Sequence, residues 1–314
     1  MEEVTVLIPT WRPDRKLNEL LDRLSKQTIL PARVLLLNTV DGDEDSQVME
    51  SVDTFRDRFP VLSVFHVDRK DFDHGGTRHL GMTFADTSLV LCMTQDALPK
   101  DTHLIRHLVR CFDDPLVGAA YARQLAGKGS SAAEQFTRTF NYPPVSAVKS
   151  AEDLETMGIK TFFCSDVCAM WRRETYFELG GFERPTIFNE DMILAGKMIR
   201  AGYRIAYAAD AQVWHSHSYS AAKQLRRNFD LGVSQADHPE VFDMASSTGE
   251  GIRLVKQTAG YLIRNKKAAQ LPKLVLDSGC KYIGYSLGKR YRKLPPDMIR
   301  RLTDNKMYWD RQKN

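Results

Sequence analysis

The chain has 314 residues, of which 43% are hydrophobic and 27% charged, and a net charge of +4, which is the composition of a soluble protein with a sizeable core. No apolar run reaches the roughly 20 residues that a membrane-spanning helix needs, and the acidic start Met1-Glu2-Glu3 has no feature of a signal peptide. We therefore expect a cytoplasmic protein.

Short apolar segments alternate with amphipathic ones in the first hundred residues. Strands are predicted at residues 4–8, 34–37, 62–67 and 89–93, and helices between them at residues 14–24, 46–59 and 77–86. This alternation predicts an α/β fold with a mainly parallel sheet, in which ligands bind beyond the carboxyl ends of the strands. Neither GxGxxG nor GxxxxGK[ST] occurs where it is needed, so a Rossmann dehydrogenase and a P-loop NTPase are disfavoured.

The second half is less regular. Helices are predicted at residues 101–112 and 220–237, strands at 117–123 and 162–171, and a loop with a short helix at 126–160. Glu190 and Asp191 begin an amphipathic helix that ends at Gly202, and two strand-like runs then lead to His215 and His217.

The charge of the chain is concentrated at one end. Residues 251–314 hold 16 Lys and Arg against 4 Asp and Glu, a net charge of +12, whereas residues 1–250 hold 28 against 36, a net charge of −8. Such a region suits a nucleic acid, an anionic membrane or an acidic substrate. We predict one domain at residues 1–240 and a basic helical extension at residues 241–314.

A glycine pair marks the most specific candidate site in the first half. The glycines allow a ligand close to the backbone, the helix that follows offers free N–H groups to a diphosphate, and an arginine adds a charged contact. The residues concerned are Asp73, His74, Gly75, Gly76 and Arg78. A plain turn followed by a helix cap is the alternative.

Two aspartates follow predicted strands. Asp41 is placed to accept hydrogen bonds from a base or a ribose, although taken alone it is explained better by an Asp-Gly turn. Asp96 is a candidate ligand for Mg²⁺ or Mn²⁺, because hard cations prefer oxygen ligands. The alternative for Asp96 is a helix cap, a role that Asp101 fills better.

The Glu190–Asp191 pair is a candidate general base, with helix-dipole stabilisation as the simpler alternative. His215 and His217 are two residues apart in a predicted strand end, lie on one side of it, and are candidate metal ligands. On the predicted helix 220–237, Gln224 and Arg227 share a face and are candidates for phosphate or acceptor binding, against a solvated helix face.

Together these residues resemble the family 2 inverting glycosyltransferases of the GT-A fold, over about residues 3–235. Asp41 resembles the base-binding aspartate, Asp96 the last residue of the Asp-x-Asp motif, and Glu190-Asp191 the pair that holds the catalytic base. Gln224-Leu-Arg-Arg resembles the Gln-x-x-Arg-Trp motif. The run from Phe72 to Arg78, with His215-Ser-His-Ser-Tyr, is similar to the bacterial rhamnosyltransferase branch, which uses dTDP-L-rhamnose to build surface polysaccharides.

The resemblance implies a Rossmann-like nucleotide-diphospho-sugar transferase with a mainly parallel central sheet flanked by helices. Asp191 would be the base, and Mg²⁺ or Mn²⁺ would be held by Asp96 with a histidine. The sugar donor would be bound by the glycine-pair residues together with Pro9, Thr10, Arg12, Asp41 and Gln95. The sequence departs from the family patterns at Thr94, His79 and Asn228.

Several alternatives stay open at this point. The donor could be a UDP- or GDP-sugar, and the protein a metal-dependent hydrolase or a non-catalytic nucleotide-sugar-binding module. The acceptor is expected to be a polysaccharide or a lipid-linked glycan, and no nucleic acid partner is expected. The basic helices either contact the inner face of the cell membrane or cap the catalytic domain or a second subunit of a homo-oligomer.

Overall fold

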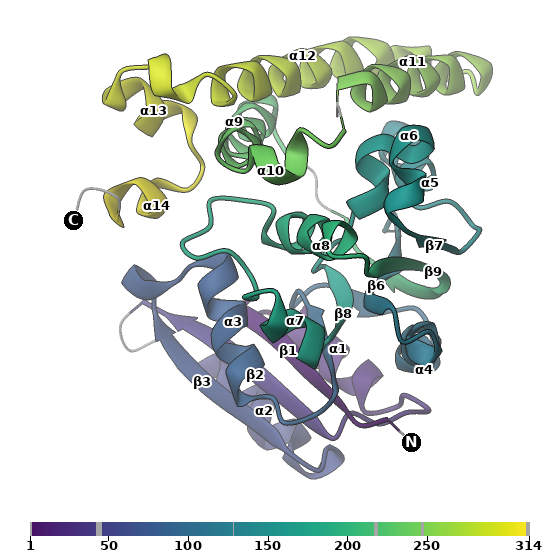
Figure 1. Cartoon of the computed structure of the whole chain (residues 1–314), viewed down its shortest axis with the longest axis vertical. Coiled ribbons are helices and arrows are strands. Elements are labelled where there is room, and N and C mark those ends of the chain that lie inside the picture. The colour runs from purple at the N-terminus through teal and green to yellow at the C-terminus, as the bar shows by residue number, and fades with distance from the viewer. Residues whose placement is uncertain (1, 42–45, 128, 217–218, 246–247, 312–314) are drawn as a thin grey trace.

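The computed structural model describes residues 2–41, 46–127, 129–216, 219–245 and 248–311, which form an α/β fold around one mixed sheet (Figure 1). The strands are β1 (Val4–Trp11), β2 (Arg33–Val40), β3 (Leu62–Asp68), β4 (Leu89–Met93), β5 (Leu98–Pro99), β6 (Val117–Leu125), β7 (Ala147–Lys149), β8 (Cys168–Arg172) and β9 (Arg204–Trp214). Their order is β3-β2-β1-β4-β8-β6-β9-β5, and β7 pairs with β9.

The predicted alternation of strands and helices in the first half is confirmed. Strands β3, β2, β1 and β4 are parallel neighbours, and β6 and β9 are parallel to each other, whereas β8 is antiparallel to both β4 and β6. Most of the sheet therefore runs in one direction, and the carboxyl ends of these strands lie along one edge.

Helices cover both faces of the sheet, which explains why its central strands are apolar without interruption. One layer contains α1 (Arg15–Leu24), α2 (Ser46–Phe55) and α4 (Leu104–Val109), and the other contains α3 (His74–Phe84), α7 (Arg173–Glu178) and α8 (Glu190–Arg200). In β1, Val6 and Ile8 pack with Leu20 of α1, while Leu7 packs with Met82 of α3. The alternation of side chains along the strand distributes β1 between two cores.

Three predictions of strands and helices differ from the structure. The strand predicted at 162–171 begins only at Cys168, because residues 158–162 form a 3-10 helix and a loop follows it. The two runs at 203–207 and 211–214 are one strand, β9, with an irregular register against β6 that absorbs the break in the pattern. The helix predicted at 77–86 begins at His74, where Asp73 caps it.

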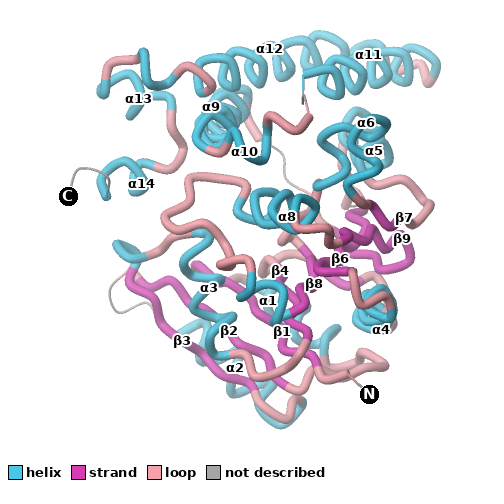
Figure 2. The backbone as a smooth tube through the Cα atoms, in the orientation of Figure 1, coloured by secondary structure: helices cyan, strands magenta, loops and turns pink. Residues whose placement is uncertain are grey.

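The region predicted as a loop at 126–160 contains α5 (Ala132–Asn141), β7 and α6 (Leu154–Met157). Beyond β9 the chain is helical, as Figure 2 shows. The elements there are α9 (Ala221–Asp237), α10 (Pro239–Phe242), α11 (Thr248–Arg264), α12 (Leu271–Gly288), α13 (Pro296–Leu302) and α14 (Lys306–Arg311). Helices α11 and α12 form the outermost layer, above α9 in Figure 1.

Glycines fix the spacing between α9 and α12. A Cβ at Gly284 would lie 2.1 Å from the carbonyl oxygen of Leu225, and one at Gly288 would lie 2.1 Å from that of Phe229. The backbones of the two helices therefore touch, and a larger residue would push them apart. Within the part of the chain that the structure describes, no helix has the length and apolar character needed to cross a membrane.

Candidate active site

A cleft of about 510 Å³ lies at the carboxyl edge of the sheet. Of the predicted site residues, those that line it are Pro9, Thr10, His74, Arg78, Gln95 and Arg227. They come from β1, α3, the end of β4 and α9, so the topology brings together segments separated by more than 200 residues.

The end of β1 is held in place by Gln95, two residues after the end of β4. Trp11 N–H donates to Oε1 of Gln95 (2.9 Å), and Nε2 of Gln95 donates to the Trp11 carbonyl (3.2 Å). Thr10 donates through its hydroxyl to Oδ1 of Asn38 on β2 (3.0 Å). These hydrogen bonds fix the end of β1, which forms one side of the cleft.

An exposed cluster of charges borders the cleft beside β1. Asp41 forms ion pairs with Arg12 (3.7 Å) and Arg69 (2.5 Å), and both guanidinium groups lie over the Trp11 ring at 5.3 and 5.4 Å. Arg12 has a φ of 45°, in the left-handed region that few side chains adopt. An exposed aromatic ring with an aspartate beside it is suited to a nucleotide base.

The glycine pair has a packing role that is independent of any ligand. A Cβ at Gly75 would lie 2.1 Å from the carbonyl oxygen of Glu183. Asp73 accepts hydrogen bonds from the N–H groups of Gly76 (2.6 Å) and Thr186 (2.8 Å), and burial raises the pKa of its carboxyl. Asp73 therefore ties the start of α3 to the loop before α8, and its contact with a sugar donor stays a prediction.

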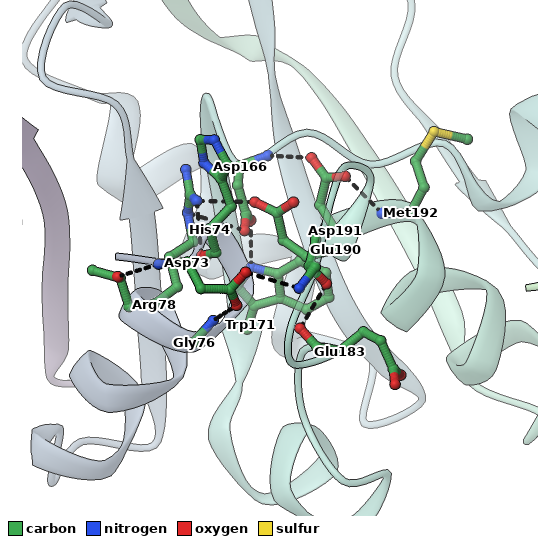
Figure 3. Close-up of polar contacts among 12 residues, drawn as sticks. Asp73, His74, Gly76, Arg78, Asp166, Trp171, Glu183, Glu190, Asp191 and Met192 are labelled. Carbon is green, nitrogen blue, oxygen red and sulfur yellow. Dashed lines mark hydrogen bonds and ion pairs between the residues drawn. The ribbon is translucent and has the colours of Figure 1, made fainter. Parts of the chain in front are cut away.

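A buried ion cluster connects α3 to α8 (Figure 3). Nη1 of Arg78 lies 2.9 Å from Oε1 of Glu190, and its Nε lies 3.4 Å from Oδ2 of Asp166. Oδ1 of Asp166 also accepts a hydrogen bond from the Trp171 ring (2.9 Å). One guanidinium thus faces two carboxylates that are hardly exposed to water.

Asp191 is oriented by the backbone on both sides. Its Oδ2 accepts from Asp166 N–H (3.0 Å), and its Oδ1 accepts from Met192 N–H (2.7 Å). Burial, followed by the charge of Glu190, raises the pKa of Asp191 to about 7. A fixed carboxylate that takes up a proton near neutral pH is suited to general base catalysis.

Asp96 and His215, two predicted metal ligands, lie beside each other at the end of the sheet. Nε2 of His215 lies 3.7 Å from Oδ1 of Asp96, and its Nδ1 lies 3.1 Å from Oε1 of Gln124. Because an amide oxygen only accepts, Nδ1 carries the proton, and in the neutral ring Nε2 then presents its lone pair toward Asp96. This pair fits a hard divalent cation.

The remaining ligands of such a site are not supplied by the described side chains. His217 lies outside the described residues. Among the described residues, here or elsewhere, no three or more His, Cys, Asp or Glu side chains are grouped as a metal site.

The two predicted residues of α9 have different positions. Arg227 lines the cleft, with its guanidinium over the rings of Phe188 (5.1 Å) and Tyr219 (4.9 Å). Gln224 is half-buried and is not among the described residues that line the cleft. Lys223, the residue before it, lines the cleft instead.

Sequence reasoning missed several residues of this site. Asp166 was hidden in a segment predicted as a strand, and nothing in its neighbourhood marks it as charged and buried. The hydroxyls of Thr39 and Thr94 line the cleft and are buried without a hydrogen-bond partner among the described residues. Two unpaired hydroxyls in one cleft indicate a polar ligand, and their position at strand ends was the available signal.

Comparison with known proteins is consistent with this geometry. A model of the family described as "Glycosyltransferase like family 2" matches residues 2–230. The chain is 37% identical over 310 residues to the O-antigen chain rhamnosyltransferase RfbN of Salmonella typhimurium, covering 98% of this chain and 96% of that protein. It is 34% identical to the O-antigen chain rhamnosyltransferase WbaN of Salmonella anatum, with 99% and 96% covered.

Solved structures show the same fold at low sequence identity. The mannosyltransferase PcManGT from Pyrobaculum calidifontis, in complex with GDP-Man and Mn²⁺, matches with a TM-score of 0.62 and 16% identity, over 93% of this chain and 88% of that one. S. aureus TarS 1–349, in complex with UDP-GlcNAc, matches with a TM-score of 0.55 and 14% identity, over 93% and 92%. The fold is therefore GT-A, as predicted.

Proposed function

The chain belongs to glycosyltransferase family 2, and from this premise we propose that it moves L-rhamnose from dTDP-L-rhamnose to a hydroxyl of a surface polysaccharide or a lipid-linked glycan. The observation that carries the proposal is the likeness to two O-antigen rhamnosyltransferases over nearly the whole chain. The run from Phe72 to Arg78, which the sequence relates to the rhamnosyltransferase branch, borders the cleft through Phe72, His74 and Arg78.

The sugar donor occupies the cleft at the carboxyl edge of the sheet. Its base lies by Trp11 and Asp41, and its diphosphate lies within reach of the cationic groups of Lys223 and Arg227 on α9. The unpaired hydroxyls of Thr39 and Thr94 then find polar partners on the ligand.

Asp191 takes the proton from the acceptor hydroxyl. The hydroxyl oxygen forms a bond to the anomeric carbon while the bond from that carbon to the diphosphate breaks, and the electron pair leaves with the diphosphate. Attack occurs opposite the leaving group, so the anomeric configuration inverts. The two backbone N–H groups that orient Asp191 keep it in position for this transfer.

Asp96 and His215 are the residues that would hold Mg²⁺ or Mn²⁺, with His217 a predicted third ligand. When bound, the ion neutralises charge on the leaving diphosphate. Gln124 keeps the protonated nitrogen of His215 turned away from Asp96.

A thermal-shift screen of nucleotide sugars, with and without Mn²⁺, tests the donor. We expect dTDP-L-rhamnose to raise the melting temperature most, with a larger shift when Mn²⁺ is present. A larger shift with a UDP- or GDP-sugar would reassign the donor. Release of free sugar at the same rate with and without acceptor would indicate a hydrolase, and donor binding without any turnover would indicate a binding module.

We further propose that α11 and α12 rest on an anionic membrane, where a lipid-linked acceptor would be found. On α12, Val275, Leu276, Tyr282 and Ile283 form one exposed apolar face, each more than half exposed. Lysines on the same two helices supply positive charge, and a groove of about 550 Å³ between them and α9 is lined by both apolar and polar side chains.

Sedimentation with vesicles tests this contact on the full chain. We expect binding to vesicles that contain anionic lipid and loss of binding in Val275→Asp. The matched control is Val145→Asp, since Val145 is equally exposed (71% against 68%) but lies before β7. Equal vesicle binding by the two variants would show that Val275 does not contact the membrane and would contradict this proposal.

A further inference from the structure

The last described segment of the chain, Thr303–Arg311, returns from the outer helices to the cleft. Helix α14 lies beside the loop that precedes α8, as Figure 1 shows. Asp304, Asn305 and Met307 line the cleft together with residues of β1 and α9. These three residues lie more than 70 positions beyond residue 230, where the match to the family model ends.

A buried carboxylate on α9 holds the start of this segment. Oδ1 of Asp230 accepts from the hydroxyl of Thr303 (2.6 Å), and its Oδ2 accepts from the N–H groups of Asp304 (2.9 Å) and Asn305 (3.2 Å). Asp230 is only 2% exposed. Each of these hydrogen bonds comes from the segment, so Asp230 fixes its backbone where it meets the cleft.

The end of the segment is tied to the opposite side of the cleft. Nη2 of Arg311 donates to the carbonyl oxygens of Lys70 and Phe72, both at 2.6 Å. Phe72 itself lines the cleft, whereas Arg311 does not. Between the two ends, Tyr308 is buried against a cluster that contains Ile187 and Phe229. The segment therefore bridges α9 and the turn before α3.

Polar groups of the segment face the same space as the cations of α9. Lys223 forms an ion pair with Asp304, at 2.7 and 2.8 Å from its two oxygens. The lysine side chain is 42% exposed, so this ion pair is weak and can exchange one partner for an anionic ligand. Asn305 caps α14 with its oxygen by accepting from Tyr308 N–H (3.2 Å), which keeps its amino group for a ligand.

We propose that Thr303–Arg311 is the closing wall of the sugar-donor site, that Asn305 contacts the donor, and that Asp304 holds Lys223 ready for the diphosphate. Asp230 and Arg311 are positioning residues that act through this segment. The inference rests on the proposed function, because it takes the ligand of the cleft to be a nucleotide sugar.

Calorimetric titration and steady-state kinetics on the full chain test the wall. We expect Asn305→Ala to weaken binding of dTDP-L-rhamnose about 3- to 10-fold, the loss of one hydrogen bond, and to leave the acceptor KM unchanged. Asn265→Ala is its control, because Asn265 is an exposed asparagine at the end of α11. Arg311→Gln should raise the donor Kd while Arg301→Gln, on exposed α13 surface, should not.

Hydrogen exchange on the unmodified protein gives a test that does not depend on folding of a variant. Saturating dTDP-L-rhamnose should slow exchange in residues 303–311 and leave the outer helix α11 unchanged. Unchanged exchange in this segment, or wild-type donor affinity in both Asn305→Ala and Arg311→Gln, would contradict the role proposed for Thr303–Arg311 but not the proposed function. If the wild-type protein bound none of the dTDP-, UDP- or GDP-sugars, the proposed function would fall and the wall with it.

Discussion

Two arginine–carboxylate clusters border the cleft, and they differ in their contact with water. Arg12, Asp41 and Arg69 have side chains that are 56%, 36% and 48% exposed, whereas Arg78, Asp166 and Glu190 are 7%, 3% and 10% exposed. Exposed ion pairs are weak and can exchange a partner for a ligand, but a buried pair that loses a partner leaves an unpaired charge away from water.

The two clusters contain the same types of side chain but are suited to different functions. The exposed cluster is suited to meet a nucleotide, because breaking it costs little free energy. The buried cluster is suited to hold α3, α8 and the loop before β8 together. It fixes Glu190, the residue before Asp191, and Asp166, whose N–H donates to Asp191. One region can adapt to a ligand, and the other preserves the position of the base.

The largest expected effect follows from removing the base. Asp191→Asn should lower the transfer rate about 10²- to 10⁴-fold, because an amide cannot take up the acceptor proton. The variant keeps its shape and its oxygen acceptor, so donor affinity should be unchanged. Initial rates and donor titration measure both quantities. A normal rate in this variant would mean that another residue is the base.

The next largest effect is expected for Arg78→Met, which should lower the free energy of unfolding much more than a matched substitution in the exposed cluster. Removing the guanidinium leaves Glu190 and Asp166 buried without their cation, so the free energy of unfolding should fall by about 3–5 kcal/mol. Arg12→Met is the matched control from the exposed cluster and should change it by less than about 1 kcal/mol. Urea denaturation measures both. Equal losses would show that burial does not distinguish the clusters.

The pH dependence of transfer should follow Asp191. Burial and the charge of Glu190 raise its pKa to about 7, and only the ionised carboxylate can accept a proton, so activity should increase as pH rises through that value. The transfer rate should fall about tenfold per pH unit as pH decreases below it and level off as pH increases above it. A rate that stays flat from pH 5 to pH 8 would contradict the raised pKa.

The smallest effect is expected in the exposed cluster. Asp41→Asn should weaken donor binding about 2- to 10-fold, the range of one hydrogen bond, with a change in unfolding free energy below about 1 kcal/mol. Titration with dTDP and with dTDP-L-rhamnose measures the change, which should be the same for both if Asp41 contacts the nucleotide. A loss of affinity seen only with dTDP-L-rhamnose would mean that Asp41 contacts the sugar and not the nucleotide.

Much of the fold was predictable because its signals are local. The buried strands β1 to β4 are short apolar runs, and the helices between them have apolar residues at helical spacing. The residues 162–167 were misassigned because a buried loop has the same apolar composition as a strand. Its functional residue, Asp166, could not be recognised, since burial of a charge depends on a partner 88 residues earlier in the chain.

By itself, the sequence determined the order of the strands and helices, the family, and the placement of Asp41, Asp96 and Asp191 near strand or helix ends, because patterns of apolar residues and helix signals act over a few residues. Only the tertiary structure decided that Arg78 pairs with Glu190, that Gln124 orients His215, and that Asp230 draws the distant residues Thr303 to Asn305 to the cleft. These contacts join residues that are 73 to 112 positions apart. No local pattern specifies such pairs, since they form only when the packed sheet and helices bring their polar groups within hydrogen-bond distance.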